Sequence, residues 1–201
     1  MKLLAPLYLL RHGETVWNLD RRMQGTRNSD LTERGRAQAA AMGRALRGEL
    51  ARAPGPTAFL RSPLGRAHET SLIIGRELGL EPGDWRDDIR LAELGYGEWE
   101  GFTWKEIEKH TPNALADWRA DPEGFCPPGG ENHFELRRRS AAVLADIAAS
   151  ATRTVVVSHG VSGAVMRGIN LGLGARAMFV LEKPQDAFFR LLAGSEQRIE
   201  V

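Results

Sequence analysis

The chain has 201 residues, of which 42% are hydrophobic and 26% are charged, so we expect one folded domain spanning residues 1–201. Its formal net charge of +1 provides no global field for nucleic acid or a membrane surface, and no apolar run approaches the ~20 residues of a membrane span. The single cysteine, Cys126, excludes an intrachain disulfide and a cysteine-rich metal site. Because the N-terminal apolar run is short and lacks a small-residue cleavage site, we expect a cytoplasmic protein.

The first predicted element is a buried strand over Leu3–Leu10, which stops abruptly at Arg11 and His12. Burying a cation and an imidazole is costly, and ligands of α/β proteins collect at the carboxyl ends of strands. Gly13 permits close backbone approach to an anion, and the Arg11 guanidinium suits phosphate or carboxylate. His12 is largely neutral, and therefore nucleophilic, near pH 7. The alternative is structural: Arg11 caps the sheet and His12 is a half-buried histidine.

The next elements lead to a second cation at a chain turn. A polar loop over Asp20–Asp30 precedes a helix expected over about Glu33–Ala53, with Thr32 as its N-cap. A strand over Thr57–Leu60 then runs into a helix that carries Arg66 in its first turn. A cation there opposes the helix dipole unless an anion is bound nearby, so Arg66 is either an anion ligand or a surface arginine.

The middle of the chain is predicted to hold a small helical cap over about residues 95–135. A polar connection over Glu81–Asp88 and a short strand over Ile89–Leu91 come first. A capping box predicts a short helix from Thr103, and another helix is expected over Asn113–Arg119. Five aromatic side chains crowd the cap: Trp99, Phe102, Trp104, Trp118 and Phe125. They indicate either a small aromatic core or the lining for an apolar leaving group, and the sequence does not decide between the two.

The last third begins with a helix expected over about Asn132–Ser150, whose arginines at 137, 138 and 139 are interpreted as solvated. The β-branched run Thr154–Ser158 is the clearest buried strand, and it leads directly into His159. Two strands therefore end in His-Gly, which predicts two imidazoles converging on one crevice. A helix over about Ser162–Leu171 and strands over Ala187–Leu192 and Arg198–Val201 complete the chain.

The histidines divide into two groups. His68, His110 and His133 lie within or at the ends of predicted helices and are interpreted as surface or structural residues. His12 and His159 could form a metal site with a carboxylate, but two nearby arginines favour an anion over a cation. We therefore expect neither a metal nor another cofactor.

Several segments, in order along the chain, resemble the histidine phosphatase superfamily, also called the phosphoglycerate-mutase-like family. The most specific is Leu-Arg-His-Gly-Glu-Thr-Val-Trp-Asn at residues 10–18. The others are Arg22–Gly25, Asn28–Gly35, Arg61–Thr70, Leu91–Gly101, Pro127–Glu131 and Ser158–Gly160. The chain departs from the family pattern at three positions, with Asn28 in place of Asp, Asp30 in place of Pro and Arg61 in place of Ser.

The resemblance implies a three-layer α/β/α sandwich with a mostly parallel central sheet, and metal-independent phosphomonoester hydrolysis through a phosphohistidine. In that scheme His12 is the nucleophile, Glu93 is the general acid and base, and Arg11, Arg66 and His159 hold the phosphoryl oxygens. It assigns substrate-phosphate binding to four further residues, Asn18, Gln24, Gly25 and Gly160. Glu98 and Glu100 are expected to order the loop or to face solvent.

Two alternatives accompany hydrolysis of a small phosphorylated metabolite. Phosphoglycerate mutases have an Ala-His-Gly-Asn-Ser motif at the second histidine, whereas this chain has Ser-His-Gly-Val-Ser at residues 158–162. Residues 94–97 also supply no cation for a second acidic group, which favours hydrolysis over mutase-type transfer. The third hypothesis, a non-catalytic phospho-ligand-binding protein, is weakened by the intact set of site residues. The sequence leaves the phosphoester and the oligomeric state open.

Overall fold

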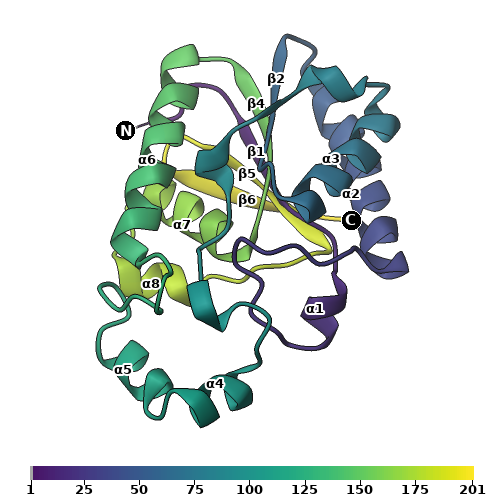
Figure 1. The fold of residues 1–201 in the computed structure, drawn as a ribbon. Coiled ribbons are helices and arrows are strands. Elements are labelled where there is room, and N and C mark those ends of the chain that lie inside the picture. The colour runs from purple at the N-terminus through teal and green to yellow at the C-terminus, as the bar shows by residue number, and fades with distance from the viewer. Residues whose placement is uncertain (1) are drawn as a thin grey trace.

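A six-stranded mixed sheet with helices on both faces forms the body of the computed structural model, which describes residues 2–201 (Figure 1). The strands are β1 (Leu7–Arg11), β2 (Thr57–Arg61), β3 (Trp85–Asp87), β4 (Arg153–Ser158), β5 (Ala187–Leu192) and β6 (Ser195–Glu200). Their order is β3-β2-β4-β1-β5-β6. The first four strands of that order run parallel, and β5 and β6 are antiparallel to their neighbours. The predicted three-layer, mostly parallel fold is confirmed.

The two large helix pairs lie on opposite faces of the sheet (Figure 1). One face is covered by α2 (Glu33–Arg52) and α3 (Gly65–Leu78), and the other by α6 (His133–Ser150) and α7 (Gly160–Leu171). The remaining helices are α1 (Val16–Leu19), α4 (Trp104–His110), α5 (Ala114–Ala120) and α8 (Ala175–Phe179). Short 3₁₀ turns occupy Pro82–Asp84, Ile89–Leu91 and Gly97–Trp99. The α4 and α5 segment extends beyond the end of the sheet.

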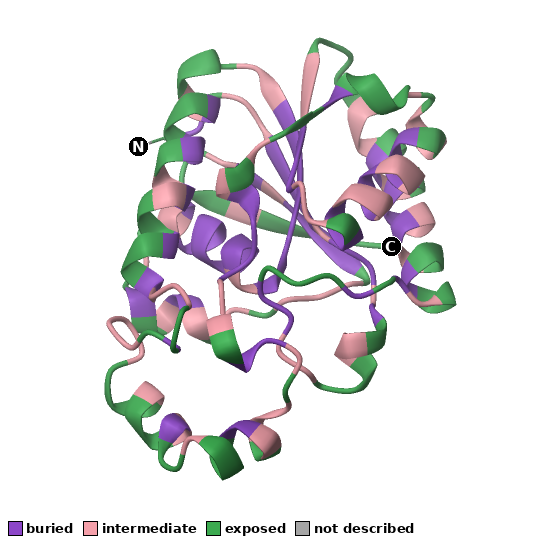
Figure 2. Ribbon diagram, in the orientation of Figure 1, coloured by how far each residue is buried: buried purple, intermediate pink, exposed green. Residues whose placement is uncertain are grey.

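Strands β1, β4 and β5 are mostly buried, drawn purple in Figure 2, whereas the edge strand β6 is mostly exposed. Side chains alternate along β1, so Leu7 and Leu9 join the core under α6 and α7. Tyr8 and Leu10 instead join the core under α2 and α3. The middle residues of β1 and β4 are largely apolar because neither face meets water, which is typical of parallel sheets.

Helix ends follow the local signals in the sequence. The Thr32 side chain accepts a hydrogen bond from the backbone N–H of Gly35 and so starts α2. Asn132 and Glu135 form a reciprocal capping box at the start of α6. Gly79 ends α3 in the left-handed conformation that glycine adopts without strain.

Two predictions about short elements were wrong. The strand expected at Ile89–Leu91 is a 3₁₀ turn, in which Asp88 accepts a hydrogen bond from the backbone N–H of Arg90. The strand lies earlier, at Trp85–Asp87, where the Trp85 ring packs against Phe59 with centroids 5.3 Å apart. The buried Trp85 fixes the pairing of β3 with β2. A strand of three residues is too short to show an alternation of apolar and polar side chains in the sequence. The five-residue helix α8 was not predicted.

Among residues 2–201, we find no helix with both the length and the apolar character needed to cross a lipid bilayer.

The buried His133 predicts how stability responds to acid. Its ring packs on Phe179 with centroids 4.2 Å apart, and burial lowers its pKa to about 4. Below pH 6.5 the unfolded chain therefore binds more protons than the folded chain, so stability falls as the pH falls. We expect His133 to contribute about 2 kcal/mol to the loss in free energy of unfolding between pH 7 and pH 5.

Urea denaturation of wild type and His133→Gln at the two pH values measures this contribution. The variant should lose about 2 kcal/mol less than the wild type over the same interval. Substitution of the exposed His110 by Gln is the matched control and should leave the loss unchanged. Equal losses in His133→Gln and wild type would contradict the assignment.

Candidate active site

The candidate site lies at the carboxyl edge of the parallel strands, where two histidines meet. Strands β1 and β4 are direct neighbours, with Arg11 opposite Ser158 in the register. The next residues, His12 and His159, are both buried, and their ring centroids are 5.2 Å apart. Ser62, which follows β2 at the same edge, lies 2.7 Å from Nε2 of His159 through its hydroxyl oxygen. The predicted convergence of the two imidazoles is what the structure displays.

The hydrogen bonds of His12 fix its tautomer. Its Nδ1 lies 2.8 Å from the carbonyl oxygen of Gly13, and because a carbonyl can only accept, Nδ1 carries the hydrogen. Nε2 is therefore the atom with the free electron pair, and it accepts a hydrogen bond from Nε of Arg66 at 3.2 Å. Burial, together with the charges of Arg11 and Arg66, holds the pKa of His12 well below its usual value. The imidazole is neutral at pH 7, as a nucleophile must be.

Two buried guanidinium groups surround this imidazole. Arg66, only 1% exposed, donates from its two terminal nitrogens to the carbonyls of Arg27 (2.7 Å) and Gly25 (2.8 Å). Burial lowers the pKa of Arg66 to about 10, which leaves it cationic at neutral pH. Arg11 donates to the carbonyl of Lys183, and its buried Nε has no protein partner. The site is therefore locally cationic in a chain of almost zero net charge, which suits an anion.

Glu93 occupies the N-terminus of α7. One carboxylate oxygen accepts from the backbone N–H groups of Ser162 (2.9 Å) and Leu94 (3.0 Å), and the other accepts from that of Val161 (3.0 Å). The unpaired N–H groups of a helix start are natural ligands of a carboxylate. These three bonds hold the Glu93 carboxylate in the wall of the site.

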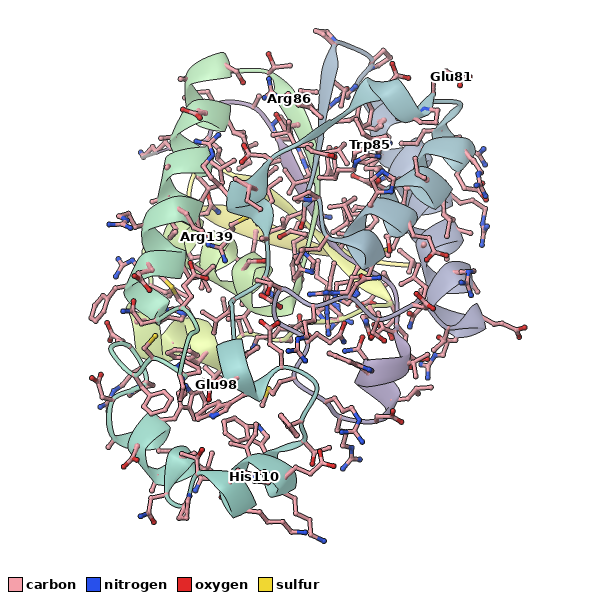
Figure 3. All side chains as sticks on the ribbon, in the orientation of Figure 1. Glu81, Trp85, Arg86, Glu98, His110 and Arg139 are labelled. Carbon is pink, nitrogen blue, oxygen red and sulfur yellow. The ribbon has the colours of Figure 1, made fainter. Side chains whose placement is uncertain are left out.

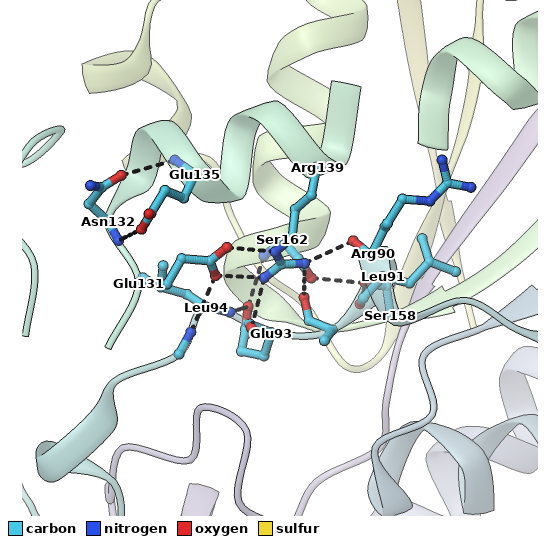
Figure 4. A network of polar contacts seen from close by, with 12 residues as sticks. Arg90, Leu91, Glu93, Leu94, Glu131, Asn132, Glu135, Arg139, Ser158 and Ser162 are labelled. Carbon is cyan, nitrogen blue, oxygen red and sulfur yellow. Dashed lines mark hydrogen bonds and ion pairs between the residues drawn. The ribbon is translucent and has the colours of Figure 1, made fainter. Parts of the chain in front are cut away.

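Arg139 holds the segment that carries Glu93 (Figure 4). Its guanidinium donates to the carbonyls of Arg90 (2.8 Å), Ala92 (2.6 Å) and Glu93 (2.9 Å). It also forms a two-point ion pair with Glu131, at 2.7 and 2.8 Å. The interpretation of all three α6 arginines as solvated was wrong for Arg139, because this side chain extends inward from α6 (Figure 3). No sequence signal distinguishes it from its exposed neighbours.

The loop over the site carries Gln24 and Gly25. Gln24 donates from Nε2 to the hydroxyl of Thr15 at 2.7 Å, and its buried Oε1 has no protein partner. Gly25 has a φ of +54°, and a Cβ at this position would collide with the carboxylate of Glu100. Glycine is required here because the backbone is left-handed and closely packed.

Glu100 orders this loop, as expected, and Glu98 faces solvent. The buried carboxylate of Glu100 accepts from the backbone N–H groups of Thr26 (2.8 Å), Arg27 (3.0 Å) and Tyr96 (3.0 Å). It thereby joins the loop to the start of the cap. Glu98 lies on the cap, exposed, in Figure 3.

Asn18 and Gly160 complete the wall by different means. The side-chain oxygen of Asn18 accepts from Nε2 of Gln185 at 3.0 Å, and the same amide group of Gln185 donates to the carbonyl of His12 at 3.2 Å. A Cβ on Gly160 would lie 3.4 Å from the guanidinium carbon of Arg11. Glycine therefore leaves room for Arg11 beside the helix start.

One cleft brings together eight of the nine residues selected from the sequence: Arg11, His12, Asn18, Gln24, Gly25, Arg66, Glu93 and Gly160. The ninth, His159, lies beside His12, with the two rings edge to face. Sequence reasoning missed five further lining residues: Arg22, Met23, Tyr96, Val161 and Lys183. Arg22 belongs to a segment that was identified, whereas Lys183 follows the unpredicted helix α8 and carries no local signal. Within residues 2–201, no group of three or more His, Cys, Asp and Glu side chains is arranged to hold a metal ion.

A second cavity, of about 190 Å³, adjoins the cleft beneath the cap. The two share four lining residues: Met23, Tyr96, Val161 and Lys183. Trp99, together with Ile107 and Ala114, also forms a small buried core within the cap. The two interpretations of the cap aromatics are therefore compatible, because the same segment has its own core and lines a cavity.

Comparison with known proteins identifies the family of this chain. The family profile of the histidine phosphatase superfamily (branch 1) matches residues 7–195. The chain belongs to this superfamily.

Its relatives include both phosphatases and mutase-like proteins. A glucosyl-3-phosphoglycerate phosphatase of Mycobacterium tuberculosis is 36% identical over 144 residues, which are 72% of this chain and 60% of that protein. A probable phosphoglycerate mutase of Salmonella paratyphi C is 37% identical over 85% of this chain and 77% of its own length. A solved structure of mycobacterial glucosyl-3-phosphoglycerate phosphatase with VO3 superposes with a TM-score of 0.78 at 29% identity, covering 98% of this chain and 97% of that one.

The Arg139 network predicts a large difference between two adjacent arginines. Arg139→Met removes the donors to three carbonyls and leaves the Glu131 carboxylate unpaired. We expect it to lower the free energy of unfolding by about 2–3 kcal/mol. Arg138→Met, at an exposed position of the same helix, should change it by less than about 0.5 kcal/mol. Urea denaturation at pH 7 measures both values, and similar losses in the two variants would contradict the role given to Arg139.

Proposed function

We propose that this protein hydrolyses the phosphomonoester of a small phosphorylated metabolite through a phosphohistidine intermediate at His12, without a metal ion. The observation that carries the proposal is the neutral His12 imidazole, whose Nε2 electron pair lies against the buried cation Arg66. A phosphoryl group bound by Arg11 and Arg66 would lie within reach of that nitrogen. Phosphoryl transfer depends mainly on positioning and on neutralising the phosphoryl oxygens, and these residues supply both.

In the first step, Nε2 of His12 attacks phosphorus, and the phosphorus–oxygen bond of the ester breaks. The leaving alkoxide takes a proton from Glu93. Arg11 and Arg66 neutralise the phosphoryl oxygens. His159 has a buried Nδ1 with no protein partner, so a phosphoryl oxygen would complete its hydrogen bonding.

In the second step, Glu93 takes a proton from a water molecule, which attacks phosphorus as the nitrogen–phosphorus bond breaks. Inorganic phosphate leaves, and His12 returns to its neutral form with Glu93 protonated again. Asn18, Gln24, Gly25 and Gly160 would bind or shape the phosphate site.

The relatives support hydrolysis over the alternatives. The mycobacterial relative is a phosphatase by name, but the aligned region spans 60% of its length, so its substrate is not carried over. Mutase-type transfer needs further free charge for a second acidic group, and residues 94–97 bring none. A non-catalytic binding protein would not require the complete set of nucleophile, arginines and acid.

Two further expectations belong to this proposal. We place the whole activity in one domain, 1–201, with the segment at about 95–135 acting as the cap that selects substrates. A cytoplasmic location suits a protein with one unpaired cysteine, Cys126.

The nucleophile can be tested with p-nitrophenyl phosphate in the presence of EDTA. Wild type should be fully active with EDTA, and His12→Ala should lose at least about 10³-fold in rate. His110→Ala, exposed on the cap, is the control and should keep wild-type activity. Phosphate trapped on His12 in base-quenched reactions, detected by mass spectrometry, would identify the intermediate. Loss of wild-type activity with EDTA alone would refute the metal-free mechanism.

The acid can be tested by changing the leaving group. Glu93→Gln should slow an alkyl phosphate by about 10²–10⁴-fold, because an alkoxide must be protonated as it leaves. With p-nitrophenyl phosphate the same variant should show a burst of one equivalent of nitrophenol and then slow turnover, since only water activation is impaired. Glu98→Gln, at an exposed position, is the control. Equal losses for both esters, without a burst, would argue against Glu93 as the acid.

A further inference from the structure

Six rings surround the second cavity in an unbroken series of contacts, and all six line it. The ring centroids along the series Phe125–Trp99–Trp104–Trp118–Phe179–His133 are 5.4, 5.7, 6.0, 5.8 and 4.2 Å apart. The first four rings come from the cap, and the last two come from α8 and α6. The contact between Trp118 and Phe179 therefore joins the cap to the body of the protein. An enclosure of this kind presents flat, apolar walls.

The charged groups of this cavity already have partners within the protein. The Glu131 carboxylate is paired with Arg139. The Lys183 ammonium donates to the carbonyls of Phe179 (2.9 Å) and Leu181 (3.0 Å). His133 is neutral at pH 7, since burial lowers its pKa to about 4. The described lining thus offers little to a second anionic group. Its buried polar atoms without a partner, Nε1 of Trp99 and Nε2 of His133, are too few for a set of sugar hydroxyls, whose burial without hydrogen bonds is costly.

The cavity adjoins the phosphate cleft. Met23, Tyr96, Val161 and Lys183 line both spaces, so a group that leaves the cleft on the cap side enters the ring of aromatics. A volume of about 190 Å³ has room for one ring-sized apolar group, since an apolar cavity of ~150 Å³ is enough to bind benzene. The natural occupant is the part of the substrate attached to the phosphate, which is the leaving group.

Building on the proposed function, we propose that the substrate is the phosphomonoester of a hydrophobic, ring-bearing alcohol, with the phosphate at His12 and the ring among the cap aromatics. This class differs from the glucosyl-phosphoglycerate that names the mycobacterial relative, because that compound carries sugar hydroxyls and a carboxylate. The same fold would then serve different metabolites through the cap segment.

Binding tests the proposal independently of turnover. The probes are 2-phenylethylphosphonate and methylphosphonate, which share the charged group and differ in the ring, and titration calorimetry gives the two affinities. The ring should tighten binding to wild type by at least about tenfold, because even one methylene in an apolar pocket contributes that much. In Trp118→Ala most of this gain should disappear while methylphosphonate binds as before.

The control removes an aromatic side chain from the same segment without touching the cavity. Phe102 is 41% exposed and does not line the cavity, so Phe102→Ala should keep the full gain. Phe179→Ala removes a ring from the opposite wall of the cavity. It replaces Trp118→Ala in the test if circular dichroism shows that Trp118→Ala does not fold. A gain of less than threefold in wild type, or a gain that survives both cavity variants, would overturn the proposal.

Turnover separates this inference from the proposed function. Comparison of 2-phenylethyl phosphate with glycerol 3-phosphate uses two alkyl esters, so the basicity of the leaving oxygen is similar in both. Preference for the phenylethyl ester in kcat/KM, lost in Trp118→Ala, supports both proposals. Hydrolysis of the two esters at equal kcat/KM keeps the phosphatase and overturns the substrate class. If the ring raises phosphonate affinity but neither ester is hydrolysed, the proposed phosphatase activity is wrong and the proposed class of ring-bearing ligand stands.

Discussion

Two guanidinium groups held out of water beside two imidazoles are the constraint on which this structure depends. Arg66 is almost fully buried, and a buried cation is tolerated only where its hydrogen-bonding capacity is satisfied. The carbonyls of Gly25 and Arg27 each accept one hydrogen bond from its terminal nitrogens, which fixes the loop that covers the site. Burial, together with the charges of Arg11 and Arg66, lowers the pKa of His12 and leaves its Nε2 electron pair unprotonated. Burial thus creates the anion affinity and the neutral nucleophile together.

Two buried glutamates hold the loops around the site by accepting hydrogen bonds from backbone N–H groups. Glu100 collects backbone N–H groups from the phosphate loop and from the start of the cap, and Glu93 collects them from α7. Neither carboxylate forms an ion pair with Arg11 or Arg66 among the described residues. The cations consequently remain available to a ligand, which a direct pair with either glutamate would prevent.

The sequence predicted what local chemistry and strand order determine. The predicted strands Leu3–Leu10 and Thr154–Ser158, which lead into His12-Gly13 and His159-Gly160, were enough to foresee two histidines at one sheet edge. The Thr32 cap located the start of one long helix, and the Pro-Pro-Gly-Gly cluster at 127–130 preceded the other, expected from about Asn132. What the sequence could not reveal depends on contacts between distant segments. Arg139 differs from Arg138 only in the direction it faces, and Lys183 reaches the cleft only because α8 folds back beside α7.

The placement of Glu93 at the start of α7 ties two properties to one side chain. The residue before this helix, His159, provides no side-chain cap, so the Glu93 carboxylate performs that task from another part of the chain. Loss of a cap typically costs about 1 kcal/mol. A homologue that has lost catalysis would still need a hydrogen-bond acceptor at this position to cap α7. A glutamate retained here in a homologue therefore reports helix capping as much as chemistry, and inactive members of such a lineage are better recognised by the fate of the nucleophilic histidine.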